Sequence, residues 1–211
     1  MLNGIECLGH STIKINKLSK TIYIDPYNIK EELQDADIIF ITHSHYDHYS
    51  PQDISKIINE NTIMVITEDL YSEVQNLGIN KENLITVKPN ETFEILNIKV
   101  STIPAYNTNK KFHPKENNWV GYILEIENTK YYIAGDTDIT EENKKVKCNV
   151  AFVPVGGTYT MNAKEAADLI NEIQPQIAVP IHYGSIVGTK QDAIDFKNLL
   201  NINIECKILI W

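Results

Sequence analysis

Residues 38–48 read Ile-Ile-Phe-Ile-Thr-His-Ser-His-Tyr-Asp-His, so that an apolar run leads directly into a group of potential metal ligands. A short, continuous apolar run such as residues 38–42 is typical of a strand that is buried on both faces. Alternate residues of an extended segment point the same way, and His43 and His45 can therefore converge on one point. Asp47 and His48 follow where the chain turns towards a helix, and they can face a second point nearby. Imidazole together with carboxylate suits zinc, and also iron or manganese.

The alternative interpretation of this segment is a polar surface turn that happens to be rich in histidine. A lone histidine is more often structural than a metal ligand. Here, however, half of the chain's six histidines fall within one window of six residues. The pattern therefore favours a metal site.

The segments around this stretch alternate between strands and helices. Residues 5–15 and 21–25 alternate apolar and polar side chains, which predicts a hairpin whose second strand ends at Asp25-Pro26. A second buried strand is expected at 63–67, preceded by a helix at 51–59 with Ser50 as its N-cap. This mixture of hairpins and strand–helix units indicates sheets covered by helices. Further strands are expected at 92–103, 119–134, 177–181 and 204–211, with a turn at 127–130 and helices that begin after Asn162 and Thr189.

The composition fits a single soluble domain over residues 1–211. That length lies within the range of one large α/β domain, and 43% of the residues are hydrophobic, enough for a core. No apolar stretch reaches about 18 residues, and the N-terminus does not read as a signal peptide. Cys7, Cys148 and Cys206 form no CxxC pair, which fits a reducing interior. We therefore expect a cytoplasmic location.

The formal net charge of -9 bears on the possible partners. Nucleic-acid affinity comes mainly from Lys and Arg side chains that neutralise phosphates, so this acidic chain is not expected to bind DNA or RNA. A bound divalent metal reverses the sign of the charge locally. The charge is thus compatible with a small-molecule substrate, phosphorylated or not. The oligomeric state stays open at this point, a homo-oligomer included.

The segment His43-Ser44-His45-Tyr46-Asp47-His48 resembles the HxHxDH signature of the metallo-β-lactamase superfamily, and the resemblance covers nearly the whole chain. Further motifs that match in order and spacing are Gly9-His10-Ser11, Asp25-Pro26, Gly135-Asp136-Thr137 and Pro180-Ile181-His182-Tyr183-Gly184. With Pro154-Val155-Gly156-Gly157 and Thr160-Met161, the chain looks most like the branch that contains L-ascorbate-6-phosphate lactonase and many metal-dependent hydrolases of unknown substrate.

This resemblance implies a four-layer αββα sandwich and a site for two divalent metal ions, with zinc expected and manganese or iron as alternatives. A carboxylate can bridge two cations, and two metals about 3.5 to 4 Å apart can ionise a water between them. Such a metal-bound hydroxide is a nucleophile at neutral pH, because coordination lowers the pKa of water to about 7. By matching position, the first metal would be bound by His43 and His45, the second by Asp47, His48 and His182, and both by Asp136, with Asp47 and His182 also catalytic.

One position departs from the family pattern. The first metal usually has a third histidine after a strand in the second half of the domain, and this chain has Asn107 there. An amide oxygen is a weaker zinc ligand than imidazole, so the first site is expected to be weak or empty. His113 lies nearby, and we interpret it as a loop or substrate-contact residue in preference to a ligand. His10 is either a residue near the metals, in contact with a ligand or substrate, or a turn residue of the hairpin. Asp25 either fixes a ligand histidine through its second ring nitrogen or forms the turn before Pro26.

Three functions are compatible with these residues. The leading one is hydrolysis of a small ester, lactone or phosphodiester. A nuclease of the same superfamily is the second, but it predicts a basic face or an added domain. A non-catalytic metal-binding or sensing module is the third, because Asn107 points to a degenerate first site. Redox chemistry is disfavoured, since the diiron relatives have a flavin partner domain and carry Glu where this chain has His45. The fold does not determine the substrate.

Overall fold

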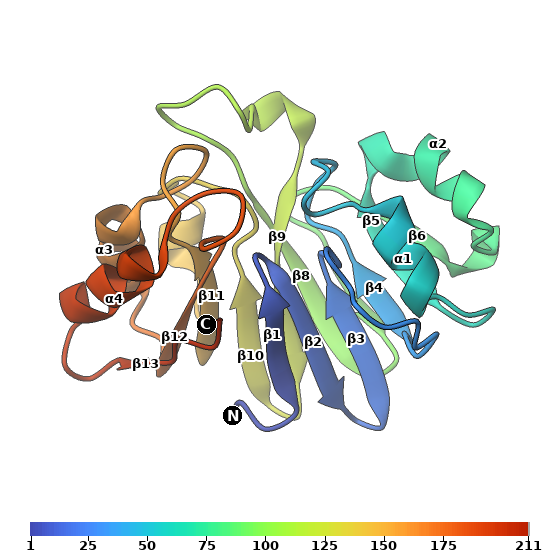
Figure 1. Ribbon diagram of the computed structural model, residues 1–211, viewed down its shortest axis with the longest axis horizontal. Coiled ribbons are helices and arrows are strands. Elements are labelled where there is room, and N and C mark those ends of the chain that lie inside the picture. The colour runs from blue at the N-terminus through green and yellow to red at the C-terminus, as the bar shows by residue number, and fades with distance from the viewer. Residues whose placement is uncertain (211) are drawn as a thin grey trace. The chain divides into compact units, whose positions relative to one another are not determined.

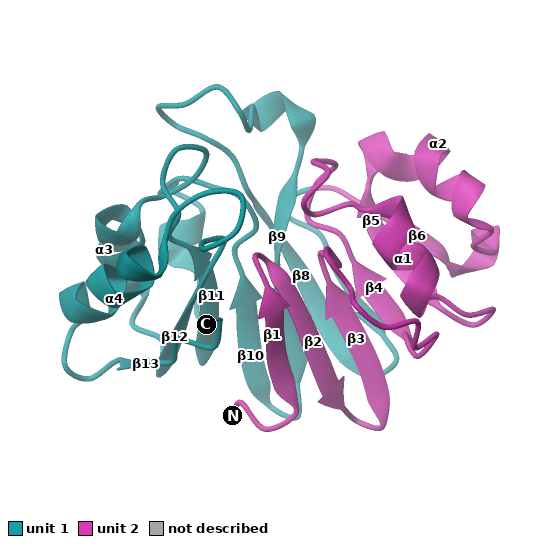
Figure 2. Ribbon diagram, viewed as in Figure 1, with its two compact units in different colours: residues 1, 89–211 teal, residues 2–88 magenta. Residues whose placement is uncertain are grey.

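The computed structural model describes residues 1–210, and the chain forms two compact units (Figures 1 and 2). Unit 2, magenta in Figure 2, consists of Leu2–Lys88, and unit 1, teal, consists of Met1 and the chain from Pro89 onwards. The expectation of a single domain over residues 1–211 stays a prediction.

Unit 2 is built on a six-stranded sheet in which the strands lie in sequence order. The first three strands pair antiparallel, and the following strands extend the sheet in parallel. The strands are β1 (Ile5–Gly9), β2 (Thr12–Lys17), β3 (Lys20–Ile24), β4 (Ile38–Phe40), β5 (Ile63–Thr67) and β6 (Leu84–Val87). The helices are α1 (Pro51–Ile57) and α2 (Tyr71–Val74), with the short 3₁₀ helices η1 (Glu68–Leu70), η2 (Gln75–Leu77) and η3 (Lys81–Asn83).

The apolar run before the histidines is part of the core of unit 2. Ile39 in β4 and Ile41 just after it are fully buried, together with Ile54 and Ile57 of α1. Burying one such side chain contributes about 1.5–3 kcal/mol. As predicted, Ser50 caps α1, because its hydroxyl accepts a hydrogen bond from the backbone of Asp53. The buried strand before the histidine segment and the capped helix after it therefore fix both ends of that segment.

The polar residues of unit 2 that the sequence singled out lie at one edge of its sheet. The carboxyl ends of neighbouring parallel strands lie at the same edge, where ligands commonly bind in such sheets. Asp25 follows β3, and residues 43–48 follow β4. The turn between β1 and β2, which contains His10, lies at that same edge because β1, β2 and β3 are antiparallel neighbours. The topology of unit 2 alone thus brings these residues together.

Unit 1 is built on a seven-stranded sheet with the order β13-β12-β11-β10-β9-β8-β7. The strands from β7 to β10 pair antiparallel, and those from β10 to β13 pair in parallel. The strands are β7 (Thr92–Ile95), β8 (Ile98–Pro104), β9 (Val120–Ile126), β10 (Thr129–Ile133), β11 (Val150–Pro154), β12 (Ile177–Ile181) and β13 (Glu205–Cys206). The helices are α3 (Ala163–Ile173) and α4 (Lys190–Leu199), with η4 (Lys115–Asn117) and η5 (Asn143–Lys145).

The strand ends of unit 1 also gather at one edge. Strands β8, β10 and β12 run in the same direction, so Asn107, Asp136 and His182, which follow them, emerge on one side. His113 lies in the connection from β8 to β9, which begins and ends at that edge. The predicted capping box of α3 is present, since Asn162 and Glu165 each accept a hydrogen bond from the backbone of the other at 2.9 Å.

Several element bounds differ from the sequence-based expectation. The stretches 5–15 and 92–103 each form two strands, because the chain turns at residues 10–11 and 96–97. The helix expected at 51–59 ends at Ile57. Strand β4 ends at Phe40 and not at residue 42, because the backbone N–H of Thr42 donates to the Asp25 side chain. The last strand, expected over 204–211, is limited to Glu205–Cys206, and Trp211 lies outside the described residues. Over residues 1–210, every helix is too short or too polar to cross a membrane.

Candidate metal centre

A buried aspartate in unit 2 holds the last histidine of the HxHxDH segment. His48 Nδ1 lies 2.7 Å from Asp25 Oδ2, and neither side chain is more than 1% exposed. A carboxylate accepts hydrogen bonds and does not donate them, so Nδ1 carries the hydrogen and Nε2 carries the lone pair that can bind a metal. The backbone N–H and the hydroxyl of Thr42 also donate to Asp25, at 2.8 and 2.7 Å. The predicted contact between Asp25 and a histidine of this segment is thus present.

The same threonine orients His43. Because the Thr42 hydroxyl donates to Asp25, its oxygen accepts the hydrogen of His43 Nδ1, 3.0 Å away. His43 therefore also presents Nε2 as its lone-pair atom. That Nε2 lies 3.2 Å from Nδ1 of His45, and the two ring centroids are 4.7 Å apart. The two alternate histidines converge, as their spacing predicts.

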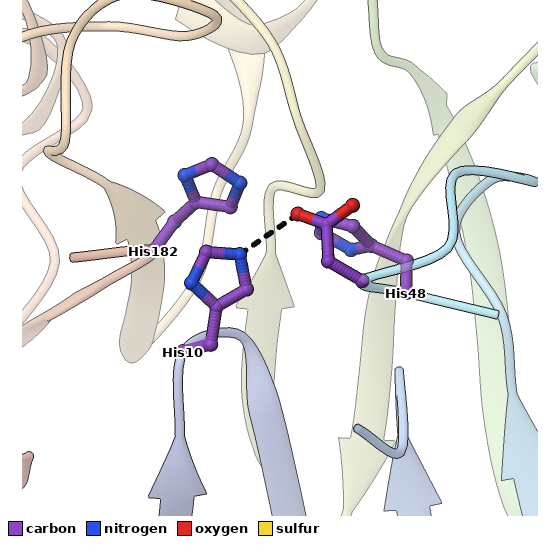
Figure 3. Close-up of side chains that lie close together, drawn as sticks. His10, His48 and His182 are labelled. Carbon is purple, nitrogen blue, oxygen red and sulfur yellow. Dashed lines mark hydrogen bonds and ion pairs between the residues drawn. The ribbon is translucent and has the colours of Figure 1, made fainter. Parts of the chain in front are cut away.

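His10 reaches Asp47 from the turn between β1 and β2. Its Nε2 lies 2.9 Å from Asp47 Oδ2, the contact drawn as a dashed line in Figure 3. Nε2 of His48 lies 3.7 Å from the same oxygen. One ligand atom from each of His10, Asp47 and His48 lies within 4.8 Å of the others, a spacing that suits a shared metal ion. Within unit 2, the structure therefore places His10 directly beside the predicted ligands Asp47 and His48.

Three residues of the candidate site have a left-handed backbone. The φ angle is +49° at His10, +47° at Asp25 and +57° at His182. Such a conformation costs of order 1–3 kcal/mol for a residue other than glycine, and it persists only where the surrounding contacts enforce it. These conformations cluster at functional sites in proteins, which agrees with a functional role for these three residues.

In unit 1, two histidines face one carboxylate oxygen. Oδ2 of Asp136 lies 3.1 Å from Nε2 of His182 and 3.3 Å from Nε2 of His113. All three side chains are buried. The structure thus brings together Asp136 and His182, both expected as ligands, and His113, for which the sequence favoured a loop or substrate-contact role, lies beside them.

Asn107 holds His113 in place. Oδ1 of Asn107 accepts the backbone N–H of His113 at 3.0 Å and lies 3.2 Å from its Nδ1, and Nδ2 donates to the carbonyl of Tyr159 at 3.0 Å. The backbone N–H identifies Oδ1 as the amide oxygen, so Nδ1 of His113 carries a hydrogen, and in the neutral ring the lone pair is on Nε2. Both polar atoms of the amide are engaged within unit 1. These contacts favour a supporting role for Asn107 over the predicted ligand role.

The loop that carries Asn107 and His113 is fastened by carboxylates that the sequence did not single out. Asp138 accepts the backbone N–H of Thr108 at 2.9 Å and the ammonium group of Lys110 at 2.6 Å. The only signal for this role is its position two residues after Asp136, directly beyond a strand. The role of Thr42 in orienting the histidines was not predicted either. The only indication in the sequence is its position immediately before His43.

A second anchor of this loop involves Glu142. The hydroxyl of Tyr106 and the ammonium group of Lys115 each donate to Glu142 at 2.8 Å. The hydrogen bond from Lys115 lowers the pKa of Glu142 to about 2, and burial raises the pKa of Tyr106 above its usual value. Both ends of the loop are therefore tied to the segment that follows β10.

Glycine is required at position 156 for a steric reason. A Cβ added to Gly156 would overlap the backbone carbonyl oxygen of His182. Glycine therefore allows the backbone of His182 to approach the segment after β11. The position of His182 depends on this close approach.

The donor set fits a divalent transition metal. Neutral imidazole and carboxylate are the ligands that such metals prefer in proteins. In the neutral form of His113, the lone pair on Nε2 faces a carboxylate oxygen at 3.3 Å, which is unfavourable unless a positive charge lies close by. A cation held by Asp136 and the two histidines would supply that charge.

The fold and the donor set define the class of this protein. The model of the Beta-lactamase superfamily domain matches residues 4–182, which include the HxHxDH segment, Asp136 and His182. The predicted mixed α/β fold of the metallo-β-lactamase type, with two sheets and helices, is confirmed.

Known proteins narrow this class to a family. A UPF0173 metal-dependent hydrolase from Thermococcus onnurineus is 29% identical to the chain, over 97% of this chain and 95% of the relative. Another, from Methanosphaera stadtmanae, is 31% identical, over 97% of this chain and 92% of the relative. The crystal structure of a candidate metal-dependent hydrolase from Parabacteroides distasonis superimposes with a TM-score of 0.82 at 29% identity, over 98% of this chain and 93% of that one. The chain belongs to the UPF0173 metal-dependent hydrolase family of the metallo-β-lactamase superfamily.

Proposed function

We propose that this chain hydrolyses a small ester, lactone or phosphodiester with the help of two divalent cations, zinc being the expected metal. The proposal rests on one observation above all: three buried histidines have their Nδ1 hydrogen directed to a neighbouring side chain. Each of them thereby presents Nε2 as its metal-binding atom. These pairs are His43 with Thr42, His48 with Asp25, and His113 with Asn107.

The proposed ligands follow the family resemblance with one change. The change is His113, which we place in the role of the third histidine of the first metal, because Asn107 already uses both its amide atoms to hold the loop. The sequence alone favours a loop or substrate-contact role for His113. By the family resemblance, the first metal would be held by His43, His45 and His113, the second by Asp47, His48 and His182, and Asp136 would be shared between them.

A divalent cation lowers the pKa of a coordinated water and so supplies a nucleophile at neutral pH. The protein's own residues prepare the site for it. Asp25 and Thr42 fix the rings of His48 and His43 before a metal binds, and Asn107 does the same for His113. Asp47 and His182 remain the candidate catalytic residues, as the family resemblance implies.

The resemblance to the branch of L-ascorbate-6-phosphate lactonase supports a small, phosphorylated lactone or ester as the first substrate class to test. The acidic composition speaks against a nuclease. The sensing alternative assumed that the first metal site lacks its third imidazole. The role proposed for His113 as that imidazole weakens this alternative. We further propose a cytoplasmic protein that acts on a small molecule, with a homo-oligomer as an open possibility.

A substrate panel tests this proposal. The protein is reconstituted with zinc, manganese or iron(II) and assayed with an aryl ester, a phosphorylated sugar lactone and bis(p-nitrophenyl) phosphate. We expect turnover of at least one substrate that a chelator abolishes and added metal restores. If a metal-loaded protein hydrolyses none of them, the proposed function is contradicted and a sensing role gains support. If cleavage is confined to nucleic acid, the nuclease alternative replaces it.

A further inference from the structure

His10 occupies an unusual position for a hairpin turn. The turn between β1 and β2 carries a histidine that is 2% exposed and has a φ angle of +49°. Glycine and asparagine adopt this backbone conformation more readily, and they are the usual residues in such turns. A buried imidazole is therefore retained here at a conformational cost, and a specific contact has to offset that cost.

The contact that His10 makes is directional. Its Nε2 lies 2.9 Å from Oδ2 of Asp47, which belongs to the HxHxDH segment (Figure 3). An ionised carboxylate only accepts hydrogen bonds, so the hydrogen of His10 lies on Nε2. The rings of Tyr27 and His48 lie edge-on at centroid distances of 6.0 Å each, and they restrict the rotation of His10.

This hydrogen bond leaves Asp47 able to bind a cation. Each carboxylate oxygen has two lone pairs, so Oδ2 can accept the Nε2 hydrogen and still leave ligand capacity on both oxygens. At the same time, His10 cannot offer Nε2 as a ligand while it donates from that atom. The geometry therefore separates the role of His10 from that of His48, whose Nε2 lies 3.7 Å from the same Oδ2.

We propose that His10 is a positioning residue, which holds the carboxylate of Asp47 in its working orientation beside His48 through the hydrogen bond from Nε2. The proposal rests on the proposed function, because Asp47 is a ligand and a candidate catalytic residue only in that reading. It extends the site to the first hairpin of the chain. A role in packing the hairpin alone would not require a hydrogen-bond donor at this atom.

Two substitutions separate the hydrogen bond from packing. His10→Gln places an amide N–H near the position of Nε2, whereas His10→Asn is too short to reach Asp47. Asn also tolerates a left-handed backbone well, so that this variant does not add strain to the turn. We expect His10→Asn to weaken metal binding and turnover about 10–100-fold while circular dichroism shows an intact fold, and His10→Gln to stay within about fivefold of the parent protein.

The hydrogen bond itself is measured independently of activity. In ¹⁵N NMR spectra of the metal-free protein, the His10 ring is expected as the Nε2–H tautomer, and Asp47→Asn is expected to shift its Nε2 signal. The proposal is overturned if His10→Asn keeps parental metal affinity, if the Gln and Asn variants lose affinity equally, or if His10 is the Nδ1–H tautomer. Direct coupling of a His10 nitrogen to bound ¹¹³Cd overturns it as well, since His10 is then a ligand. A protein that binds metal but hydrolyses nothing contradicts the proposed function alone, because metal affinity and the NMR signal still report on His10.

Discussion

Asp25 Oδ2 and His48 Nδ1 lie 2.7 Å apart, and both side chains are buried. The same carboxylate accepts two hydrogen bonds from Thr42, whose hydroxyl in turn receives the Nδ1 hydrogen of His43. One aspartate therefore sets the tautomer of two histidines, of one directly and of the other through a threonine. This part of the site is formed by the fold of unit 2 itself.

Replacing Asp25 with Asn tests this relationship. Whichever way the amide turns, its NH₂ group faces a hydrogen-bond donor where an acceptor is needed. We expect metal affinity to fall about 10–100-fold. We also expect the free energy of unfolding to fall by about 1–3 kcal/mol. Metal titration and urea unfolding measure the two effects.

The matched control is Asp53→Asn. Asp53 is also a buried aspartate of unit 2, and it accepts hydrogen bonds from the backbone of Asn28 and Ile29 instead of from a histidine. This variant is expected to lose stability and to keep its metal affinity. If both variants lose metal affinity to the same extent, the effect is not due to the histidine tautomer.

The pair of Asn107 and His113 gives a second prediction. His113→Ala is expected to empty the first metal position, because it removes the proposed third imidazole. Asn107→His is expected to weaken that position as well, because the substituted ring removes the amide that receives the Nδ1 hydrogen of His113. Metal titration counts the remaining sites, with Asn117→Ala in the same loop as an unaffected control. Tighter binding in Asn107→His would return Asn107 to the ligand position that the sequence predicts.

Gly156→Ala is expected to displace His182. The added Cβ overlaps the backbone carbonyl oxygen of His182, and such overpacking costs about 1–3 kcal/mol. Because His182 is a proposed ligand, metal affinity should fall together with stability. Gly78→Ala is the control, since its Cβ meets no atom within 4 Å and only the φ angle of +77° is unfavourable, at about 1–2 kcal/mol. Equal metal affinity in both variants would show that the close approach to Gly156 does not position His182.

The cysteines give a prediction that depends on pH. Burial raises the pKa of the Cys7 and Cys148 thiols to about 12 and that of Cys206 to about 11. The thiolate is the reactive form, so near neutral pH all three should react with iodoacetamide at least about tenfold more slowly in the folded protein than in urea. The rate should rise with pH up to these pKa values. A thiol that is labelled equally fast before and after unfolding contradicts this expectation.

The sequence predicted the parts of the site that depend on local pattern and on strand order. Residues 38–48 combine a buried strand with ligands at alternate positions, and the convergence of His43 and His45 follows from that spacing. For Asp25 the sequence left two roles open, and the contact with His48 is present because Asp25 follows a strand that pairs in parallel with β4. The convergence of His43 and His45 needs only the period of a strand.

The loop between β8 and β9 could not be predicted in the same way. Alignment by motif places Asn107 where a histidine is usual, but the course of residues 105–119 is set by contacts distant in sequence. Asp138 and Glu142 fasten the loop, and the carbonyl of Tyr159 receives the Asn107 amide. No local pattern in the loop indicates these partners. The placement of His113 beside Asp136 follows from them.

The central claim is that this chain holds divalent metal through its histidine and carboxylate residues. Elemental analysis of protein purified without chelator and then reconstituted measures this directly, with His48→Ala and Asp136→Ala as variants. We predict between about one and two equivalents of zinc, iron or manganese in the parent protein. Both variants should lose most of that metal while circular dichroism shows an intact fold. Less than about a tenth of an equivalent in the reconstituted parent protein, or a parental metal content in both variants, would contradict the account.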